Sequence, residues 1–201
     1  NLLQQLVAFP TVSRTSNLEL LDWLSAQVEA LGGRVRAVKS THTDRANIIA
    51  TLGPDAPGGL LLSGHTDVVP PGENWDSDPW VLTRMGDCFV ARGAADMKGF
   101  FAAVLHAISD FDVDQLLAPV HLLASYDEEI GCQGVRDVLP FLAADPMVRP
   151  EIIIIGEPTM MRPRHSHLGK ELHRLTVTTP EAHSSRAAIS PSAIAVAAEL
   201  I

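Results

Sequence analysis

The sequence predicts an α/β fold, with a mostly parallel, doubly wound sheet flanked by helices. Three apolar runs, at residues 60–64, 120–124 and 151–155, end at glycine or at polar residues, as is typical of strands covered on both faces. Stretches with helical spacing of apolar residues lie between these runs, so strands and helices alternate along the chain. With 201 residues, the chain is long enough for one sizeable core and part of a second domain.

The individual elements follow from apolar spacing and from residues that stop helices. A first helix is predicted before Pro10, and a second between Ser16 and Leu31, where two glycines follow. Ser16 and Glu19 have the spacing of a capping box at the start of that second helix. Further elements are predicted in this order: strands at 34–38 and 47–52, a hairpin turn at 86–87, and helices at 97–111 and 134–142.

Composition and charge exclude several classes of function. Hydrophobic residues make up 46% and charged residues 19% of the chain, which excludes a disordered protein. The formal charge of −9 argues against a nucleic-acid partner. Because no apolar run is as long as a membrane span and no leader precedes Leu2, we expect a cytoplasmic protein without a membrane partner. Cys88 and Cys132 stand alone in the sequence, so we expect buried free thiols.

Potential metal ligands follow the ends of the predicted strands, where open α/β sheets bind their ligands. One His-x-Asp pair after a strand is a weak signal, but acids recur after the later apolar or glycine-rich segments. The set consists of His65, Asp67, Asp96, Glu128, Glu129 and Glu157. One imidazole with several carboxylates suits zinc, with cobalt or manganese as alternatives. Since the four acids downstream of Asp67 would repel one another in one pocket, we expect two divalent ions with a shared ligand.

The spacing of these residues assigns some roles and leaves others open. His65 and Asp67 share a face of an extended strand, so Asp67 is expected to orient the imidazole of His65. Asp96 is our choice for the bridging ligand because it lies in a tight, glycine-flanked turn. Of Glu128 and Glu129, one is expected to bind metal and the other to act as general base toward metal-activated water. The chemistry alone does not say which.

Six short motifs occur in a fixed order: SGHTDVVP, WDSDPW, ARGAADMKGF, SYDEEIGCQGV, IIGEPT and AHSS. Together they resemble the acetylornithine deacetylase and succinyl-diaminopimelate desuccinylase family of co-catalytic zinc amidohydrolases. The resemblance covers nearly the whole chain and implies a zinc-peptidase-like catalytic domain followed by a smaller α+β dimerisation or lid domain. We therefore expect residues 1–168 to form the metal-binding catalytic domain, without its C-terminal part. Residues 169–201, a β-rich stretch and then a helix at about 190–201, are expected to begin the lid domain.

The resemblance also implies a role for each site residue. His65 and Glu157 would bind the first ion and Glu129 the second, with Asp96 between them. Glu128 would be the general base, and Asp67 the partner of His65. His183, in AHSS, would reach the active site of the neighbouring subunit, which implies a homodimer of the full-length protein. A further His on the second ion would lie beyond residue 201, so we expect this piece alone to be weakly active or inactive.

The expected reaction is hydrolysis of an N-acyl amino acid, a small-molecule substrate. SYDEEIGCQGV most resembles the deacetylase branch, which removes the acetyl group of N2-acetyl-L-ornithine in arginine synthesis. Alternatives within the enzyme class are a desuccinylase, a metallo-carboxypeptidase or an aminoacylase. The alternative of another class is a truncated, non-catalytic relative that keeps the fold and one structural metal. Glu128 argues against that alternative, because a structural site does not use an unliganded base.

Overall fold

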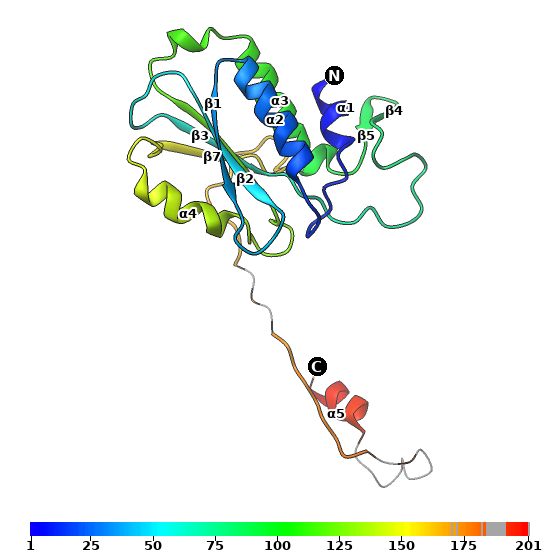
Figure 1. Cartoon of the computed structure of the whole chain (residues 1–201). Helices are drawn as coiled ribbons and strands as arrows, with labels where there is room; N and C mark the ends of the chain where they lie inside the picture. The colour runs from blue at the N-terminus through cyan, green and yellow to red at the C-terminus, as the bar shows by residue number, and fades with distance from the viewer. Residues whose placement is uncertain (170, 172, 182, 184–191, 201) are drawn as a thin grey trace. The chain divides into compact units, whose positions relative to one another are not determined.

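A computed structural model describes residues 1–169, 171, 173–181, 183 and 192–200 (Figure 1). The chain divides into two compact units, Asn1–Met161 and Arg162–Ile201. All predicted metal ligands lie in the first unit, and His183 lies in the second. The assignment of residues 1–168 and 169–201 to a catalytic and a lid domain stays a prediction.

Five strands form the central sheet of the first unit, in the order β1-β2-β6-β3-β7. β3 runs parallel to both β6 and β7, whereas β2 runs antiparallel to β1 and β6. β1 and β2 are joined by a short loop without a helix, which permits only an antiparallel pair. The strands are β1 (Arg34–Lys39), β2 (Ala46–Leu52), β3 (Leu60–His65), β6 (Val120–Ser125) and β7 (Ile152–Ile155). The predicted α/β class is confirmed, and the sheet is mixed.

Helices cover both faces of this sheet (Figure 1). The helices are α1 (Leu2–Val7), α2 (Leu18–Ala30), α3 (Gly99–Ser109) and α4 (Val135–Ala144). On one face, Leu6, Leu24 and Phe101 from the first three helices pack with Leu122 of β6 in one core. On the other face, Val138 of α4 belongs to a second core that includes strand residues. Burial of apolar side chains on both faces is what holds the central strands in place.

The remaining elements are short. β4 (Thr83–Met85) and β5 (Cys88–Val90) form the predicted hairpin, which is confirmed. Two turns, η1 (Ala94–Lys98) and η2 (Val113–Gln115), precede and follow α3, and α5 (Ala193–Glu199) lies within the helix predicted at 190–201. Between residues 162 and 183, the described positions form no strand, so the predicted β-rich stretch is not observed there. In the described part of the chain, no helix has the length and apolar character needed to cross a membrane.

Two predictions about burial are wrong. Cys88 and Cys132 are exposed, although buried thiols were expected. The four isoleucines of β7 were expected in a strand covered on both faces, but their exposed fractions range from 46% to 64%. β7 stands at the end of the strand order, so it has one neighbouring strand among the described residues. The apolar composition of residues 152–155 therefore predicted a strand correctly, but it did not show whether other residues pack on both faces of that strand.

Candidate metal centre

Three parallel strands bring the predicted ligands to one edge of the sheet. β3 pairs with β6 through His65 and Ser125, and with β7 through Ser63 and Ile155. The segments that follow these strands therefore begin side by side. The backbone N–H of Gly156 continues the pairing by donating to the carbonyl of Ser63.

His65 stands at the centre of the site with only 1% of its surface exposed. Its Nδ1 lies 2.8 Å from the backbone carbonyl oxygen of Asp67. A carbonyl can only accept, so Nδ1 carries a proton, and Nε2 is the nitrogen that can bind a metal once its own proton is lost. Nε2 lies 3.1 Å from Asp96 Oδ1, 3.7 Å from Glu157 Oε1 and 3.9 Å from Glu128 Oε2. The nitrogen that can bind a metal thus faces three carboxylates.

The sequence predicts only that Asp67 orients His65, but its carboxylate also binds the backbone of Glu128 and Glu129. It lies 3.5 Å from His65 Nδ1, and the shorter contact to that ring comes from the backbone carbonyl. Its two oxygens accept hydrogen bonds from the backbone N–H groups of Glu128 at 3.0 Å and Glu129 at 3.3 Å, and from Ser13 Oγ at 2.8 Å. Burial opposes ionisation of Asp67, but His65, Ser13 and the Glu128 N–H outweigh it and lower the pKa. Asp67 therefore fixes the turn that carries both glutamates.

The candidate ligand atoms form two overlapping groups that share His65. One group contains His65, Asp96 and Glu129, and the other contains His65, Glu128 and Glu157. Within each group, one potential ligand atom per residue lies within 4.8 Å of the others. An imidazole nitrogen with carboxylate oxygens is a donor set that suits zinc, cobalt or manganese. The residues present therefore fit a centre for divalent metal ions.

The electrostatics of the centre also favour a cation. Burial alone would lower the pKa of His65, but Asp67 and Glu157 outweigh it and raise the pKa to about 9. Burial raises the pKa of Glu129, and the charge of Asp96 adds to this rise. The pKa of Glu157 is raised by burial and by neighbouring carboxylates, against the influence of His65. The repulsion expected among these acids is thus present, and bound cations would relieve it.

Asp96 is presented by the turn η1, which runs directly into α3. The peptide bond between Asp96 and Met97 is cis. Two residues later, Lys98 is fully buried, and its Nζ donates a hydrogen bond to the carbonyl of Phe9 at 2.6 Å. Burial lowers the pKa of Lys98 to about 7, against the influence of Asp67. Lys98 therefore anchors the turn that carries Asp96, and only its place in ARGAADMKGF pointed to it in the sequence.

Two glycines allow the start of α3 to lie against the strand ends. A Cβ on Gly156, next to Glu157, would lie 2.2 Å from the ring of Phe100. A Cβ on Gly64, next to His65, would lie 2.8 Å from Cε of Met97. The distance at Gly156 is too short for any side chain, so glycine there permits the close packing next to Glu157, whereas at Gly64 the contact is with the flexible end of Met97.

The comparisons with known proteins agree with this geometry. Residues 61–201 match peptidase family M20/M25/M40. The chain belongs to this family. Acetylornithine deacetylase from Proteus mirabilis (strain HI4320) is 40% identical over 192 residues, which are 92% of this chain and 48% of that protein. The enzyme of the same name from Pasteurella multocida (strain Pm70) is 39% identical over 188 residues, 90% of this chain and 48% of that protein. The chain thus spans about half the length of these curated relatives.

Solved structures share the fold of this chain. The M20 family metallo-carboxypeptidase Sso-CP2 from Sulfolobus solfataricus superposes with a TM-score of 0.66 at 29% identity, over 77% of this chain and 36% of that one. Human carnosine dipeptidase 1 gives a TM-score of 0.66 at 24% identity, over 76% of this chain and 36% of that one. The family resemblance and the zinc-peptidase-like fold inferred from the motifs are confirmed.

A buried acid that the sequence analysis missed supports the same turn in this M20 chain. Asp127 is 1% exposed and has a positive φ of 52°. Its carboxylate accepts a hydrogen bond from the backbone N–H of Arg14 at 2.8 Å and forms an ion pair with Arg45. Asp67 thus binds the backbone N–H groups of Glu128 and Glu129, and Asp127 ties the preceding residue of the same turn to Arg14 and Arg45. The SYDEEIGCQGV motif contains Asp127, but its partners lie far away in sequence.

His183 lies in the second unit and is exposed. The other residues of its motif, Ala182, Ser184 and Ser185, lie outside the described residues. The catalytic role that the family resemblance implies for His183 stays a prediction.

Proposed function

We propose that this chain is part of a metal-dependent amidohydrolase that removes the acetyl group from N2-acetyl-L-ornithine. The gathering of His65 with four carboxylates at one sheet edge is the observation that carries the proposal. The substrate is supported by relatives at 39–40% identity that are named acetylornithine deacetylase.

Two divalent ions, preferably zinc, would be held by His65, Asp96, Glu129 and Glu157. Asp96 would contribute to holding both ions, since its Oδ1 lies only 3.1 Å from His65 Nε2 and its charge also acts on Glu129. Divalent ions held there supply Lewis-acid chemistry, because they polarise an amide carbonyl and lower the pKa of water. The role of the protein is to hold the ions and to keep His65 in the Nδ1–H form through the Asp67 carbonyl.

Glu128 is the proposed general base. Cys132 Sγ donates to its Oε1 at 3.4 Å, while its Oε2 lies 3.9 Å from His65 Nε2. Oε1 of Glu128 is thus held by the Cys132 thiol, and Oε2 faces His65. Oε2 accepts a proton from the water that attacks the acyl carbon, and Glu128 then delivers this proton to the amide nitrogen as the C–N bond breaks. Glu129, whose backbone N–H donates to Asp67 Oδ2, would then serve as a metal ligand.

The test compares three substrates on the full-length, zinc-loaded protein. Equal concentrations of N2-acetyl-L-ornithine, N-succinyl-diaminopimelate and a dipeptide are hydrolysed side by side, and kcat/KM is measured for each. The proposal predicts the highest value for N2-acetyl-L-ornithine. No hydrolysis of any substrate by a protein with full metal content would instead support the non-catalytic alternative.

A peptidase is the second candidate function. It is favoured by the likeness to Sso-CP2, which is named a metallo-carboxypeptidase and is 29% identical to this chain. Preference for the dipeptide in the same assay would select it. The cytoplasmic location, the homodimer and the role of His183 stay predictions that accompany either function.

A further inference from the structure

Residues 9–14 lie between α1 and α2, outside the central sheet (Figure 1). We call them the 9–14 segment. Its side chains and backbone bond to three stretches of the candidate metal centre, which are residues 66–68, the turn η1 and residue 127. Between 54 and 113 positions of sequence separate the side-chain bonding partners. One short segment therefore contacts three turns that carry site residues.

The 9–14 segment pairs with the residues that follow β3. The Val68 N–H donates to the Thr11 carbonyl and the Ser13 N–H donates to the Val68 carbonyl, both at 3.0 Å, so the two stretches lie side by side like parallel strands. Thr11 Oγ1 donates to the Thr66 carbonyl at 2.6 Å. Ser13 Oγ donates to Asp67 Oδ2 at 2.8 Å. The backbone immediately after β3 is thereby fixed to the segment.

The two ends of the segment hold the other two turns. At its start, the Phe9 carbonyl accepts a hydrogen bond at 2.6 Å from Nζ of Lys98, the last residue of η1. At its end, the Arg14 N–H donates to Asp127 Oδ1 at 2.8 Å, directly before the proposed base. The φ of Arg14 is 73°, which a residue with a Cβ rarely adopts unless its surroundings hold it there. The contact with Asp127 thus helps to hold Arg14 in an unfavourable conformation.

These contacts are shielded from water, since Thr11, Asp67, Lys98 and Asp127 are all buried. A buried polar group that loses its partner carries the cost of its desolvation unless the backbone moves to satisfy it. Metal sites tolerate little movement of this kind, because ligand atoms must stay within about 0.2 Å of their bonding distances. Loss of one contact should therefore displace a metal ligand as well as loosen the fold.

We propose that Thr11 and Ser13 are positioning residues of the metal centre. Through the 9–14 segment they fix the relative positions of the turns that carry His65, Asp96 and Glu128. Their hydroxyl groups act on bound ions only through the residues that they hold. The inference rests on the metal centre of the proposed function, and loss of such an outer partner typically weakens metal binding about 10–100-fold.

Cobalt binding to the full-length protein, freed of its metal, tests this role. Cobalt(II) is the probe because its visible d–d spectrum depends on the geometry of its ligands, and chelator competition gives its dissociation constant. We expect Thr11→Val, which keeps the shape of the side chain without its hydroxyl, to weaken cobalt binding about tenfold and to change the spectrum. Ser13→Ala should do the same. Thr11→Ser, which keeps the hydroxyl, should show the affinity and the spectrum of wild type.

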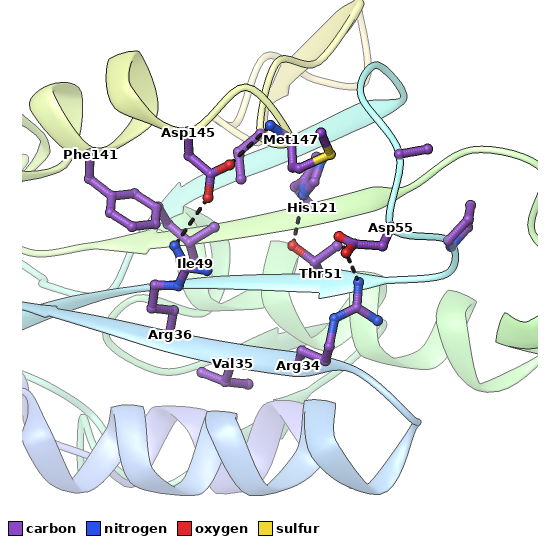
Figure 2. Close-up of a pocket in the computed structure, with 13 residues that line it drawn as sticks. Arg34, Val35, Arg36, Ile49, Thr51, Asp55, His121, Phe141, Asp145 and Met147 are labelled. Atoms are coloured by element: carbon purple, nitrogen blue, oxygen red, sulfur yellow. Dashed lines mark hydrogen bonds and ion pairs between the residues drawn. The ribbon is translucent and has the colours of Figure 1, made fainter.

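Thr51→Val is the matched control for stability. Thr51 Oγ1 also bonds to a buried partner, His121 Nδ1 at 2.9 Å (Figure 2). On β6, His121 lies four residues before Ser125, the residue that pairs with His65, so about 13 Å of strand separates this bond from the metal centre. Loss of the Thr51 hydroxyl should lower the free energy of unfolding, measured by urea denaturation, and leave cobalt affinity unchanged.

The outcomes separate this inference from the proposed function. A wild-type protein that binds no cobalt would refute the metal centre, and the positioning role with it. Wild-type binding with an unchanged dissociation constant and spectrum in Thr11→Val and Ser13→Ala would overturn the positioning role alone. An equal loss of cobalt affinity in Thr51→Val would also overturn it, because the effect would then follow general stability.

Discussion

Replacement of Asp67 by Asn should loosen the turn that carries Glu128 and Glu129. In the structure, Oδ1 of Asp67 accepts from the Glu128 N–H, while Oδ2 accepts from the Glu129 N–H and from Ser13. An Asn amide has only one oxygen, so its NH₂ group must face one of the two backbone donors in either orientation. One backbone N–H then loses its charged acceptor in a site where Asp67 is only 3% exposed.

The size of the effect follows from these contacts. Loss of one charge-assisted hydrogen bond and exposure of an unpaired buried N–H together should lower the free energy of unfolding by about 2–4 kcal/mol. The pKa of His65 should also fall below its value of about 9, because Asp67 is the main group that raises it. Both effects have one cause, the replacement of the carboxylate by a neutral amide with one acceptor oxygen.

Urea denaturation of the metal-free protein at pH 7 measures the free energy of unfolding, and NMR titration measures the pKa of His65. Asp78→Asn is the matched control, because exposed Asp78 also accepts a backbone N–H, from Trp80 at 2.9 Å, and Asn can keep that bond. We expect the control to stay within about 0.5 kcal/mol of wild type. If Asp67→Asn matched the control in stability and left the His65 pKa unchanged, the proposed clamp on Glu128 and Glu129 would be wrong.

Three further predictions concern the metal centre. Glu128→Gln should keep the metal content of wild type and lower kcat by about 10²–10⁴-fold, since it removes only the base; unchanged kcat would exclude Glu128. Asp96→Asn should lower both metal content, measured by atomic absorption, and activity; full metal content would exclude a bridging role. Metal affinity should rise about tenfold per pH unit from pH 7 to 9 and then level off. The reason is that metal-free His65, with a pKa of about 9, must lose a proton to bind metal; chelator competition with no pH dependence would contradict this.

Local patterns predicted most of the fold. Apolar runs and helix stops located β3, β6 and the helices within a few residues, because these signals depend on near neighbours in sequence. The start of α2 shows where such signals fail. The predicted capping box of Ser16 and Glu19 is wrong, because Asn17 is the N-cap residue. Its side chain bonds instead to the backbone of Ala46 and to Thr66, so the sheet holds this helix end.

In the candidate site, too, local sequence signals predicted some residues, whereas contacts between distant residues were missed. The clustering of the acids around His65 could be predicted because each acid follows a predicted strand or turn, and parallel strands bring such positions to one edge. The supports of the site were missed because their partners are distant in sequence. Asp67 holds residues 61 and 62 positions away, and Lys98 holds Phe9, 89 positions away. The isoleucines of β7 show the same limit, since composition does not reveal what packs on a strand.

Anomalous diffraction at the zinc edge, from zinc-loaded crystals of the full-length protein, tests the metal centre most directly. We predict two zinc peaks at the ends of β3, β6 and β7, with His65 Nε2 bound to one ion, Asp96 between the two, and Glu128 bound to neither. Zinc peaks without His65 as a ligand, or no zinc at this sheet edge, would contradict the proposed centre.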